Sequence, residues 1–550
     1  MIVFRHAVTP VRGERLLREV RRASAAGSRP EAGLRLLLAA AALESAVSDY
    51  WGAVSDADDR PRAAARHLLL LAARAFLGNA VSHQVWEAAV HAVAVTLPPR
   101  HEALPVGYPE GFCFYGLHPN VYVDCAHRWA ARHSATAGAP VVVIGLRTIG
   151  SALAAVVSAA LLARGYIVRL LTLRPRGRPE DRYYAVAREL EATLRDSGAC
   201  FIVADEGPGL SGSSFGGAVS WLRQLGISGA RISLFPSWDP PADRLSHTVV
   251  SRDWGRWEKY PAGATLVPGM ALQELSAGRW RAVFPPARPV PVWPQQERAK
   301  YLSGDGRHVL KFEGLGAFGD AAFDRARFLA QADFAPAVVR EGGGWLRFER
   351  IRCRPLINAG ARAAAWMGRY LAFVRSQFSV GSSAPPSPAL QLMMRENFAH
   401  LTGHSPTVEA PEGVPVLLDG RMLPQEMAHG AGGLIKFDSV DHADDHFFPG
   451  PCDIAWDLAA VAIEFGPAIG AVTLQEYERR SGDHVSAQRL AWHRLAYASF
   501  RAAFADFAAE LVADPDRMLF LRQFARYREA VLSESGLAPV PETAPPRVAA

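Results

Sequence analysis

Cysteine is scarce in this sequence, and the cysteines present have no arrangement typical of a metal site or a disulfide framework. Five cysteines stand far apart among 550 residues: Cys113, Cys125, Cys200, Cys353 and Cys452. No CxxC or Cys/His pair has the spacing of a zinc site, and an odd number of cysteines argues against a disulfide framework. The sequence therefore predicts neither a structural zinc ion nor a fold held by disulfides.

Long apolar runs are also missing. The first residues, MIVFRHAVTPVRGERLL, lack the long apolar core of a signal peptide. The longest apolar stretch, residues 149–165, is rich in Ala and Ser and lies between two strand-like segments, which indicates a buried helix rather than a membrane span. We therefore expect a soluble, cytoplasmic protein with no membrane partner.

No block of basic residues stands out, although the formal net charge is +6. Arginine supplies most of the positive charge and lysine is scarce, so each lysine merits inspection. A mild basic excess without a basic stripe or a helix-turn-helix pattern argues against nucleic acid as a partner. Small anionic ligands are compatible with this charge, and the sequence leaves the oligomeric state open.

The composition, 49% apolar and 21% charged residues, is that of a globular protein long enough for two or three domains. We expect an α/β domain with a parallel sheet and a helical N-terminal extension, followed by an α+β two-lobed domain. The expected ranges are 1–100 for the helical extension, 101–250 for the α/β domain, 251–298 for a Pro-rich linker, 299–535 for the α+β domain and 536–550 for a disordered tail. The extension is expected mainly to pack against the domain that follows it.

Between residues 110 and 240, short β-branched runs alternate with helical segments. The strand candidates are APVVVIGL, YIVRLLTL, ACFIVAD and ARISLFPS, and helices are expected over 151–164, 181–196 and 213–225. This alternation predicts a parallel sheet that is covered on both faces. Ligands bind such sheets at the carboxyl ends of the strands.

At the end of one of these strands stands VADEGPGLSGSSF, residues 203–215. A Gly/Ser loop before a helix offers N–H groups, hydroxyl donors and the positive end of the helix dipole, which together suit a phosphate. The lysine of a Walker A loop is missing, which argues against a nucleoside triphosphate here. Carboxylates would repel a phosphate, so we expect Asp205 and Glu206 to accept hydrogen bonds from sugar hydroxyls. The alternative is a capped helix after a strand, without any ligand.

This combination resembles the phosphoribosyl diphosphate (PRPP) signature of type I phosphoribosyltransferases, over residues 110 to 245. The resemblance implies that Asp205 and Glu206 are catalytic residues that hold the ribose hydroxyls, that the loop after them holds the 5′-phosphate, and that Mg²⁺ assists the departure of pyrophosphate. It places the segment 172–182, with its four arginines, where the family has a mobile basic loop. The implied PRPP contacts are Arg147, Thr148, Arg174, Arg178, Gly209, Ser211, Gly212, Ser213 and Ser214. The loop has Ser where the family has a Thr-rich TGxT, which keeps the hydroxyls, whereas Pro208 removes one amide.

The second half of the chain has a lysine and three aspartates in an order typical of one kinase family. Lys311 lies on an early strand, Asp419 and Asp438 each follow a later apolar strand, and Asp457 lies on an apolar helix. This order resembles aminoglycoside-phosphotransferase-like kinases over residues 300 to 535. The resemblance implies that Lys311 contacts ATP phosphates, that Asp419 is the catalytic residue that orients the acceptor hydroxyl, and that Asp457 braces the catalytic loop. The implied ligands of Mg²⁺ are Asp438 or Asp441, together with Gln425.

Several features depart from that family or leave alternatives open. The Asn expected five residues after the catalytic Asp is Pro424, with Gln425 or Glu426 as substitutes, and the helix after Lys311 has only Asp320 and Asp324 instead of a Glu. The acid- and His-rich segment DSVDHADDHFF is compatible with a Mg²⁺ or Mn²⁺ site, a transition-metal site or a solvated loop. The match of GLGAFG to GxGxxG lacks a convincing acid at a strand end further on, so a dinucleotide site is a minor alternative.

Together these patterns predict a bifunctional enzyme. One module would transfer phosphoribose from PRPP to a small nitrogenous acceptor, and the other would use ATP and Mg²⁺ to phosphorylate a small molecule. The alternative is a regulatory protein that senses PRPP or a nucleotide and carries a degenerate kinase-like module.

Overall fold

The computed structural model describes residues 1, 8–26, 30–133, 140–178, 180–263, 267–269, 271–440, 447–448 and 450–537. Over these ranges no helix is both long enough and apolar enough to cross a membrane. The expected disordered tail lies almost wholly outside the described residues, and so does most of the acid- and His-rich segment.

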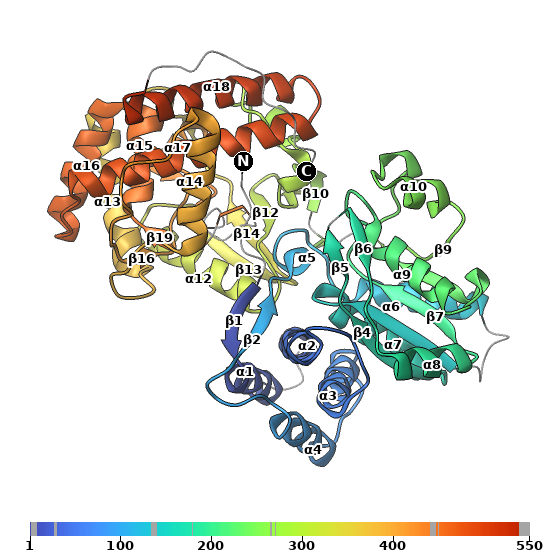
Figure 1. The fold of residues 1–550 in the computed structure, drawn as a ribbon. Coiled ribbons are helices and arrows are strands. Elements are labelled where there is room, and N and C mark those ends of the chain that lie inside the picture. The colour runs from blue at the N-terminus through green and yellow to red at the C-terminus, as the bar shows by residue number, and fades with distance from the viewer. Residues whose placement is uncertain are drawn as a thin grey trace.

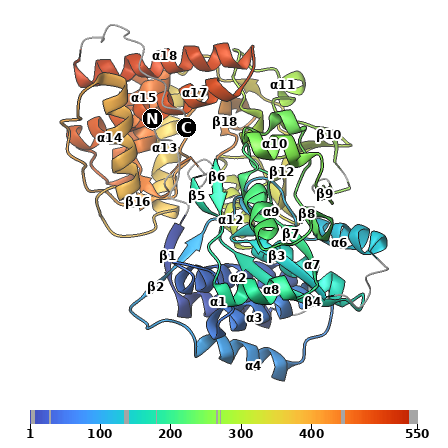
Figure 2. The same cartoon turned by 45° about the vertical axis from the view of Figure 1, so that its right-hand side comes forward.

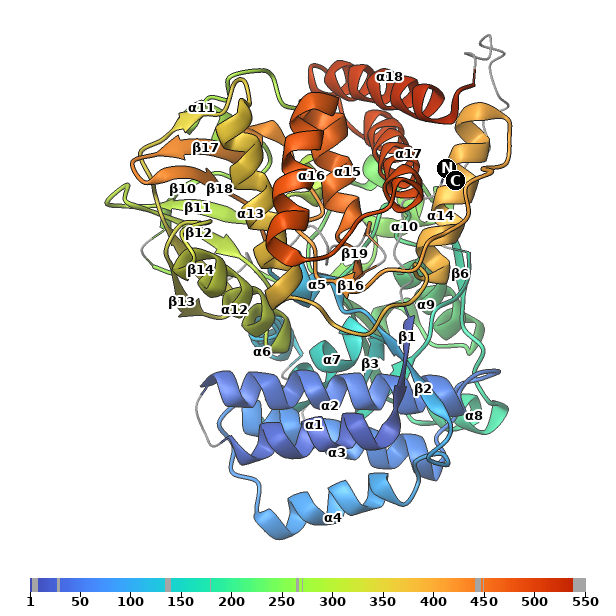
Figure 3. The same cartoon turned by 90° about the vertical axis from the view of Figure 1, so that its left-hand side faces the viewer.

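The N-terminal residues form a helical layer, as the Leu/Ala-rich periodicity predicts (Figure 3). Its helices are α1 (Gly13–Ala25), α2 (Pro30–Trp51), α3 (Arg60–Phe76) and α4 (His83–Ala94). Strand β1 (Val8–Arg12) precedes them and pairs antiparallel with β2 (Ala103–Gly107), which follows them. Helix α3 begins where the Asp59 side chain accepts a hydrogen bond from the Arg62 amide, which is a typical N-cap. The apolar faces of α2 and α3 share one hydrophobic core with the next domain.

The next domain contains a parallel sheet of β3 (Pro140–Leu146), β4 (Ile167–Leu173), β7 (Cys200–Ala204), β8 (Ile232–Phe235) and β9 (Glu258–Lys259). Their spatial order is β4-β3-β7-β8-β9, and every neighbouring pair is parallel. Chain order therefore reverses at β3, which lies between β4 and β7. In doubly wound sheets such a reversal marks the point where ligands bind, beyond the carboxyl ends of the strands.

Helices cover both faces of this sheet (Figure 1). Its strands are apolar at successive positions, and successive side chains point to opposite faces, so both faces are apolar. Val141 and Val143 pack with α6 (Val121–Arg132) and α7 (Ile149–Leu162), on the side of the N-terminal helices. Val142 and Ile144 face the other side. That side is covered by α8 (Arg188–Asp196), α9 (Ser213–Gln224) and α10 (Thr248–Trp254).

A small antiparallel hairpin, β5 (Arg176–Arg178) with β6 (Asp181–Tyr183), follows β4 and lies against α9 (Figures 1 and 2). Close contact needs a glycine, since a Cβ on Gly217 of α9 would lie 2.3 Å from the carbonyl oxygen of Arg182. The helix expected over 181–196 therefore begins only at Arg188.

The second half opens with an antiparallel sheet in the order β10-β11-β12-β14-β13. The strands are β10 (Ala271–Glu274), β11 (Lys300–Ser303), β12 (His308–Phe312), β13 (Val338–Gly342) and β14 (Trp345–Glu349). Helix α12 (Ala317–Gln331) connects β12 to β13. The region 251–298 differs from the expected linker, because its short strands complete two sheets: β9 joins the parallel sheet and β10 joins this one.

The rest is mainly helical and contains two small sheets (Figure 3). The sheets contain β15 (Arg354–Pro355), β17 (Met427–Gly430) and β18 (Gly433–Lys436), and β16 (Pro415–Val416) with β19 (Cys452–Asp453). The helices are α13 (Ala361–Gln377), α14 (Pro388–Thr402), α15 (Ala455–Phe465), α16 (Pro467–Ser481), α17 (Ala487–Leu511) and α18 (Asp516–Ser535). Buried aromatic side chains such as Trp456 and Tyr497 fill the core between them.

Candidate functional site

Two half-buried carboxylates stand at the carboxyl end of β7, next to the point where strand order reverses. Asp205 accepts a hydrogen bond from the backbone N–H of Gly150, at the start of α7, and Glu206 accepts one from the backbone N–H of Gly111. Burial raises the pKa of Asp205 to about 7, and burial with repulsion from Asp205 and Glu110 raises the pKa of Glu206 to about 8. The pair therefore titrates near neutral pH.

The Gly/Ser loop after the acids leads into α9 as the sequence predicts. Gly212 has φ +68°, and a Cβ there would lie 2.9 Å from Val250, so glycine is required by both conformation and space. Within the loop Gly209 is exposed, whereas Ser213 is buried and its amide donates to the Ser211 hydroxyl at 3.2 Å. Tyr184 anchors Ser214 by donating to its carbonyl oxygen at 2.8 Å. The loop is therefore a turn held by hydrogen bonds, and Gly209 within it is exposed to solvent.

Arg147, which the resemblance implies is a PRPP contact, is engaged inside the protein. Its guanidinium is fully buried between Asp49 and Asp56 of the N-terminal segment, and Nε lies 3.0 Å from Asp49 Oδ1. These ion pairs connect the end of β3 to the N-terminal helical segment. Thr148, next to it, is half-buried and accepts a hydrogen bond from the Arg174 guanidinium at 3.3 Å.

The Arg-rich segment is tied to the same end of α2. Arg174 donates to Asp49 at 2.9 Å and to the Arg147 carbonyl oxygen at 2.7 Å, and its charge opposes the rise in the pKa of Asp205. Its role as a PRPP contact stays a prediction. Arg176 donates to the carbonyl oxygen of Ala53 at 2.8 Å, just beyond the last turn of α2. Arg178, on β5, is exposed to solvent. Sequence reasoning missed the partners of these arginines, although the acid-rich stretch SDADD was a signal for them.

The second candidate site begins with Lys311 on β12. Its ammonium lies 3.1 Å from Glu313 and forms an ion pair with Asp438, which follows β18 with φ +57°. This pair joins the five-stranded sheet to the three-stranded sheet. Glu313, two residues after the lysine, was not predicted as a partner.

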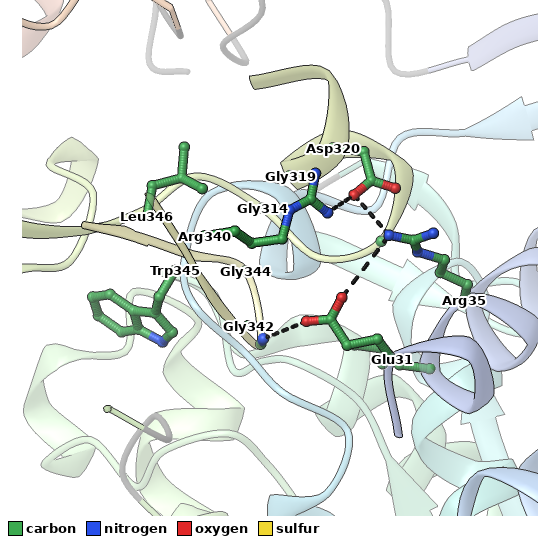
Figure 4. A pocket seen from close by; sticks show the side chains of 13 residues that line it. Glu31, Arg35, Gly314, Gly319, Asp320, Arg340, Gly342, Gly344, Trp345 and Leu346 are labelled. Atoms are coloured by element: carbon green, nitrogen blue, oxygen red, sulfur yellow. Dashed lines mark hydrogen bonds and ion pairs between the residues drawn. The ribbon is translucent and has the colours of Figure 1, made fainter. Parts of the chain in front are cut away.

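Helix α12 does not supply the partner of Lys311 that its position suggests. Asp320 instead accepts hydrogen bonds from Arg35, at 2.8 Å, and from Arg340 (Figure 4). Arg35, Asp320 and Arg340 line a pocket, together with the glycines of GLGAFG and of the turn between β13 and β14. A Cβ on Gly319 would lie 2.0 Å from the Gly314 carbonyl oxygen, so these glycines let the first turn of α12 pack closely against the loop that follows β12. This is not the βαβ setting that a dinucleotide fingerprint requires.

Asp419 lies beyond β16 in a segment that Asp457 of α15 holds in place. The two carboxylate oxygens of Asp457 accept hydrogen bonds from the amides of Asp419 and Gly420, both at 3.0 Å. Burial and repulsion from Asp419 raise the pKa of Asp457, and the two amides oppose that rise. The indole N–H of Trp456 donates to the Gly420 carbonyl oxygen at 3.2 Å and completes the support.

The Asp419 carboxylate is fully buried and has two side-chain partners. It accepts a hydrogen bond from the Tyr370 hydroxyl at 2.5 Å, and the Lys436 ammonium lies 3.1 Å away. Burial first, and then Asp419, raises the pKa of Tyr370, so the hydroxyl keeps its proton. Lys436 also donates to Glu426 at 2.9 Å.

Of the predicted metal ligands, the structure describes Asp438 and Gln425, and neither has a described contact with Asp419. Asp438 is occupied by Lys311, and Gln425 is exposed in the turn 424–426, so Glu426 rather than Gln425 faces the cluster. Asp441 lies outside the described residues. Across the part of the chain that the structure describes, no group of three or more His, Cys, Asp or Glu side chains is arranged to hold a metal ion.

A single turn, α5 (Glu110–Cys113), connects the two sites. The Gly111 amide binds Glu206, and the carbonyl oxygen of Phe112 accepts a hydrogen bond from the Leu315 amide at 2.8 Å, just after β12. The Cys113 carbonyl oxygen accepts one from Arg298, also at 2.8 Å. The carboxylate pair and the strand that carries Lys311 are therefore in contact with the same turn.

Comparison with known proteins gives partial matches in fold. No protein-family model matches the chain, and no curated protein does. Among solved structures, the macrolide 2′-phosphotransferase MphH from Brachybacterium faecium matches with 16% identity and a TM-score of 0.28, over 41% of this chain and 88% of its own. Choline kinase LicA from Streptococcus pneumoniae matches with 13% identity and a TM-score of 0.31, over 43% and 90%. Aminoglycoside 2′-phosphotransferase-IIIa matches with 11% identity and a TM-score of 0.28, over 45% and 96%.

These three matches are with small-molecule kinases and phosphotransferases, and each covers less than half of this chain. Part of this chain is similar to these proteins. TM-scores this low assign no activity to the chain. They give no support to the expected phosphoribosyltransferase domain. The case for function therefore depends on the contacts described above.

Proposed function

We propose that the second half of the chain is an ATP-dependent phosphotransferase that acts on a hydroxyl group of a small molecule. The observation that carries this proposal is the ion pair of Lys311 with Asp438. Two residues before Asp438, Lys436 contacts Asp419, which Asp457 holds in place. Phosphoryl transfer depends almost entirely on positioning and on neutralising charge. A lysine for the phosphates and a fixed carboxylate for the acceptor are the groups that this chemistry needs.

In this proposal the acceptor takes the place of a protein hydroxyl. Tyr370 donates to Asp419 at 2.5 Å, which is the contact that a substrate hydroxyl would make with a residue that orients it. Movement of Tyr370 would expose Asp419 to the acceptor. Lys311 would contact the phosphates of ATP while it stays paired with Glu313 and Asp438.

The test measures phosphoryl transfer from ATP to a panel of hydroxylated amines, sugars and macrolides. The variant Asp419→Asn is expected to lose transfer to every acceptor that the wild-type protein phosphorylates. The matched control is Asp324→Asn, which changes an exposed aspartate on α12 and is expected to leave transfer unchanged. Wild-type protein that neither binds ATP nor phosphorylates any acceptor would overturn the proposal.

A second candidate function belongs to the α/β domain, and one observation favours it. The acids Asp205 and Glu206 lie half-buried where strand order reverses, beside a glycine loop at the start of α9. We infer that this edge binds a sugar 5′-phosphate such as PRPP, with ribose hydroxyls on the acids and the phosphate at the loop. Because Arg147 and Arg174 are engaged by Asp49, backbone amides and Thr148 would meet the diphosphate.

Incubation with PRPP, Mg²⁺ and a panel of nitrogenous bases tests this second function. Release of pyrophosphate that Asp205→Asn abolishes supports a transferase. Saturable PRPP binding without turnover supports the sensor instead. Absence of binding rejects both roles for this edge.

A further inference from the structure

Lys436 is a buried cation surrounded by oxygen atoms. It is one of four lysines in the chain, and its side chain is fully enclosed at the end of β18. Its ammonium lies 3.1 Å from Asp419 Oδ1 and 2.9 Å from Glu426 Oε2, and it donates to the carbonyl oxygen of Phe437 at 3.0 Å. Three oxygen atoms from three residues thus converge on one positive charge.

The electrostatics keep this ammonium protonated. Burial alone would lower the pKa of Lys436, but Asp419 and Glu426 raise it well above its usual value. An unpaired ammonium in the interior costs several kcal/mol, roughly, so its burial depends on these carboxylates. The same ammonium neutralises both carboxylates, since it lies within 3.1 Å of Asp419 and 2.9 Å of Glu426.

Phosphoryl transfer usually needs a divalent metal ion close to the catalytic carboxylate. In kinases the metal is held by an aspartate after a strand and by a side chain from the catalytic loop, and it neutralises the phosphates. Mg²⁺ takes about six oxygen ligands at about 2.0–2.1 Å, most of them free to face the ion. Here Asp419 and Glu426 face an ammonium, and Asp438 faces Lys311. The described residues therefore do not fit Mg²⁺ at this position.

We propose that the ammonium of Lys436 takes the place of that metal ion, so that this site binds a nucleotide without a divalent cation. Lys436 acts as a positioning residue: it neutralises Asp419 and Glu426 and fixes them, as a metal ion would. Lys311 is left to neutralise the phosphates directly. The inference rests on the proposed ATP site.

The first experiment compares ATP binding to the full-length protein, by calorimetry, in excess Mg²⁺ and in excess EDTA. Affinities that agree within about threefold, less than 1 kcal/mol, support the inference. Binding that requires Mg²⁺ overturns the inference and leaves the proposed phosphotransferase intact. Absence of binding under both conditions overturns the proposed function and the inference with it.

A second experiment uses Lys436→Gln, which removes the positive charge and leaves Asp419 and Glu426 facing each other. We expect this variant to bind Mn²⁺, detected by electron paramagnetic resonance without nucleotide, roughly tenfold more tightly than the wild type. The control is Lys300→Gln, which removes a lysine paired with Glu297 at 3.0 Å, outside the cluster. Equal Mn²⁺ binding by all three proteins would overturn the inference. If Lys436→Gln does not fold, the comparison of Mg²⁺ with EDTA in the wild-type protein decides.

Discussion

The substitution Glu206→Gln is expected to change how stability depends on pH. The folded-state pKa of Glu206 is about 8, because the side chain is buried near Asp205 and Glu110, against an ordinary value of 4.5. Between these two values the folded protein holds a proton that the unfolded chain has released, so the wild-type protein loses stability as pH rises. The slope is about 1.4 kcal/mol per pH unit, or about 3 kcal/mol from pH 5 to pH 7. In a domain of this size that corresponds to roughly 5–10 °C in melting temperature.

The assay is thermal unfolding of wild-type and variant proteins at pH 5 and pH 7. Glutamine keeps an oxygen for the Gly111 amide and cannot ionise. The melting temperature of Glu206→Gln minus that of the wild type should therefore rise by roughly 5–10 °C from pH 5 to pH 7. Glu189→Gln, an exposed change on α8, provides the baseline. A difference between Glu206→Gln and wild type that stays constant from pH 5 to pH 7 would refute the reasoning.

Two other substitutions test the buried contacts. Asp457→Ala leaves the amides of Asp419 and Gly420 without an acceptor, and each unsatisfied amide costs about 1–3 kcal/mol of stability. The melting temperature should therefore fall by several degrees. An unchanged melting temperature would contradict this bracing role. Arg147→Met leaves Asp56 buried without its cation and leaves Asp49 paired with Arg174 alone, and it should cost about 3–5 kcal/mol of stability. Weaker PRPP binding with full thermal stability would instead favour Arg147 as a ligand contact.

The layout of the parallel sheet could be predicted from the sequence because its strands are dense in β-branched residues. The run VVVI over 141–144 matches β3, and CFIVA matches β7 as Cys200–Ala204. The carboxylates after β7 and the glycine loop before α9 followed from that pattern. The strands β9 and β10 could not be predicted, because they have two and four residues and lie among prolines and glycines.

The partners of the charged side chains could not be predicted either, since most of them come from distant segments. Arg147 meets Asp56, 91 positions away, and Lys311 meets Asp438, 127 positions away. The scarcity of lysine drew attention to Lys311 but gave no indication that Lys436 would lie against Asp419. Local spacing carries information about helices and strands, whereas an ion pair depends on how those elements are finally packed.

The turn α5 also bears on how this chain can be handled as two pieces. A polypeptide that stops before Arg298, or one that starts after it, would break the bond from Arg298 to the Cys113 carbonyl oxygen. It would also expose Leu310, Phe312 and Trp345, which share a hydrophobic core with the N-terminal helices. Half-molecules are thus expected to aggregate when produced separately, and co-production of both pieces is the sounder route to a split version.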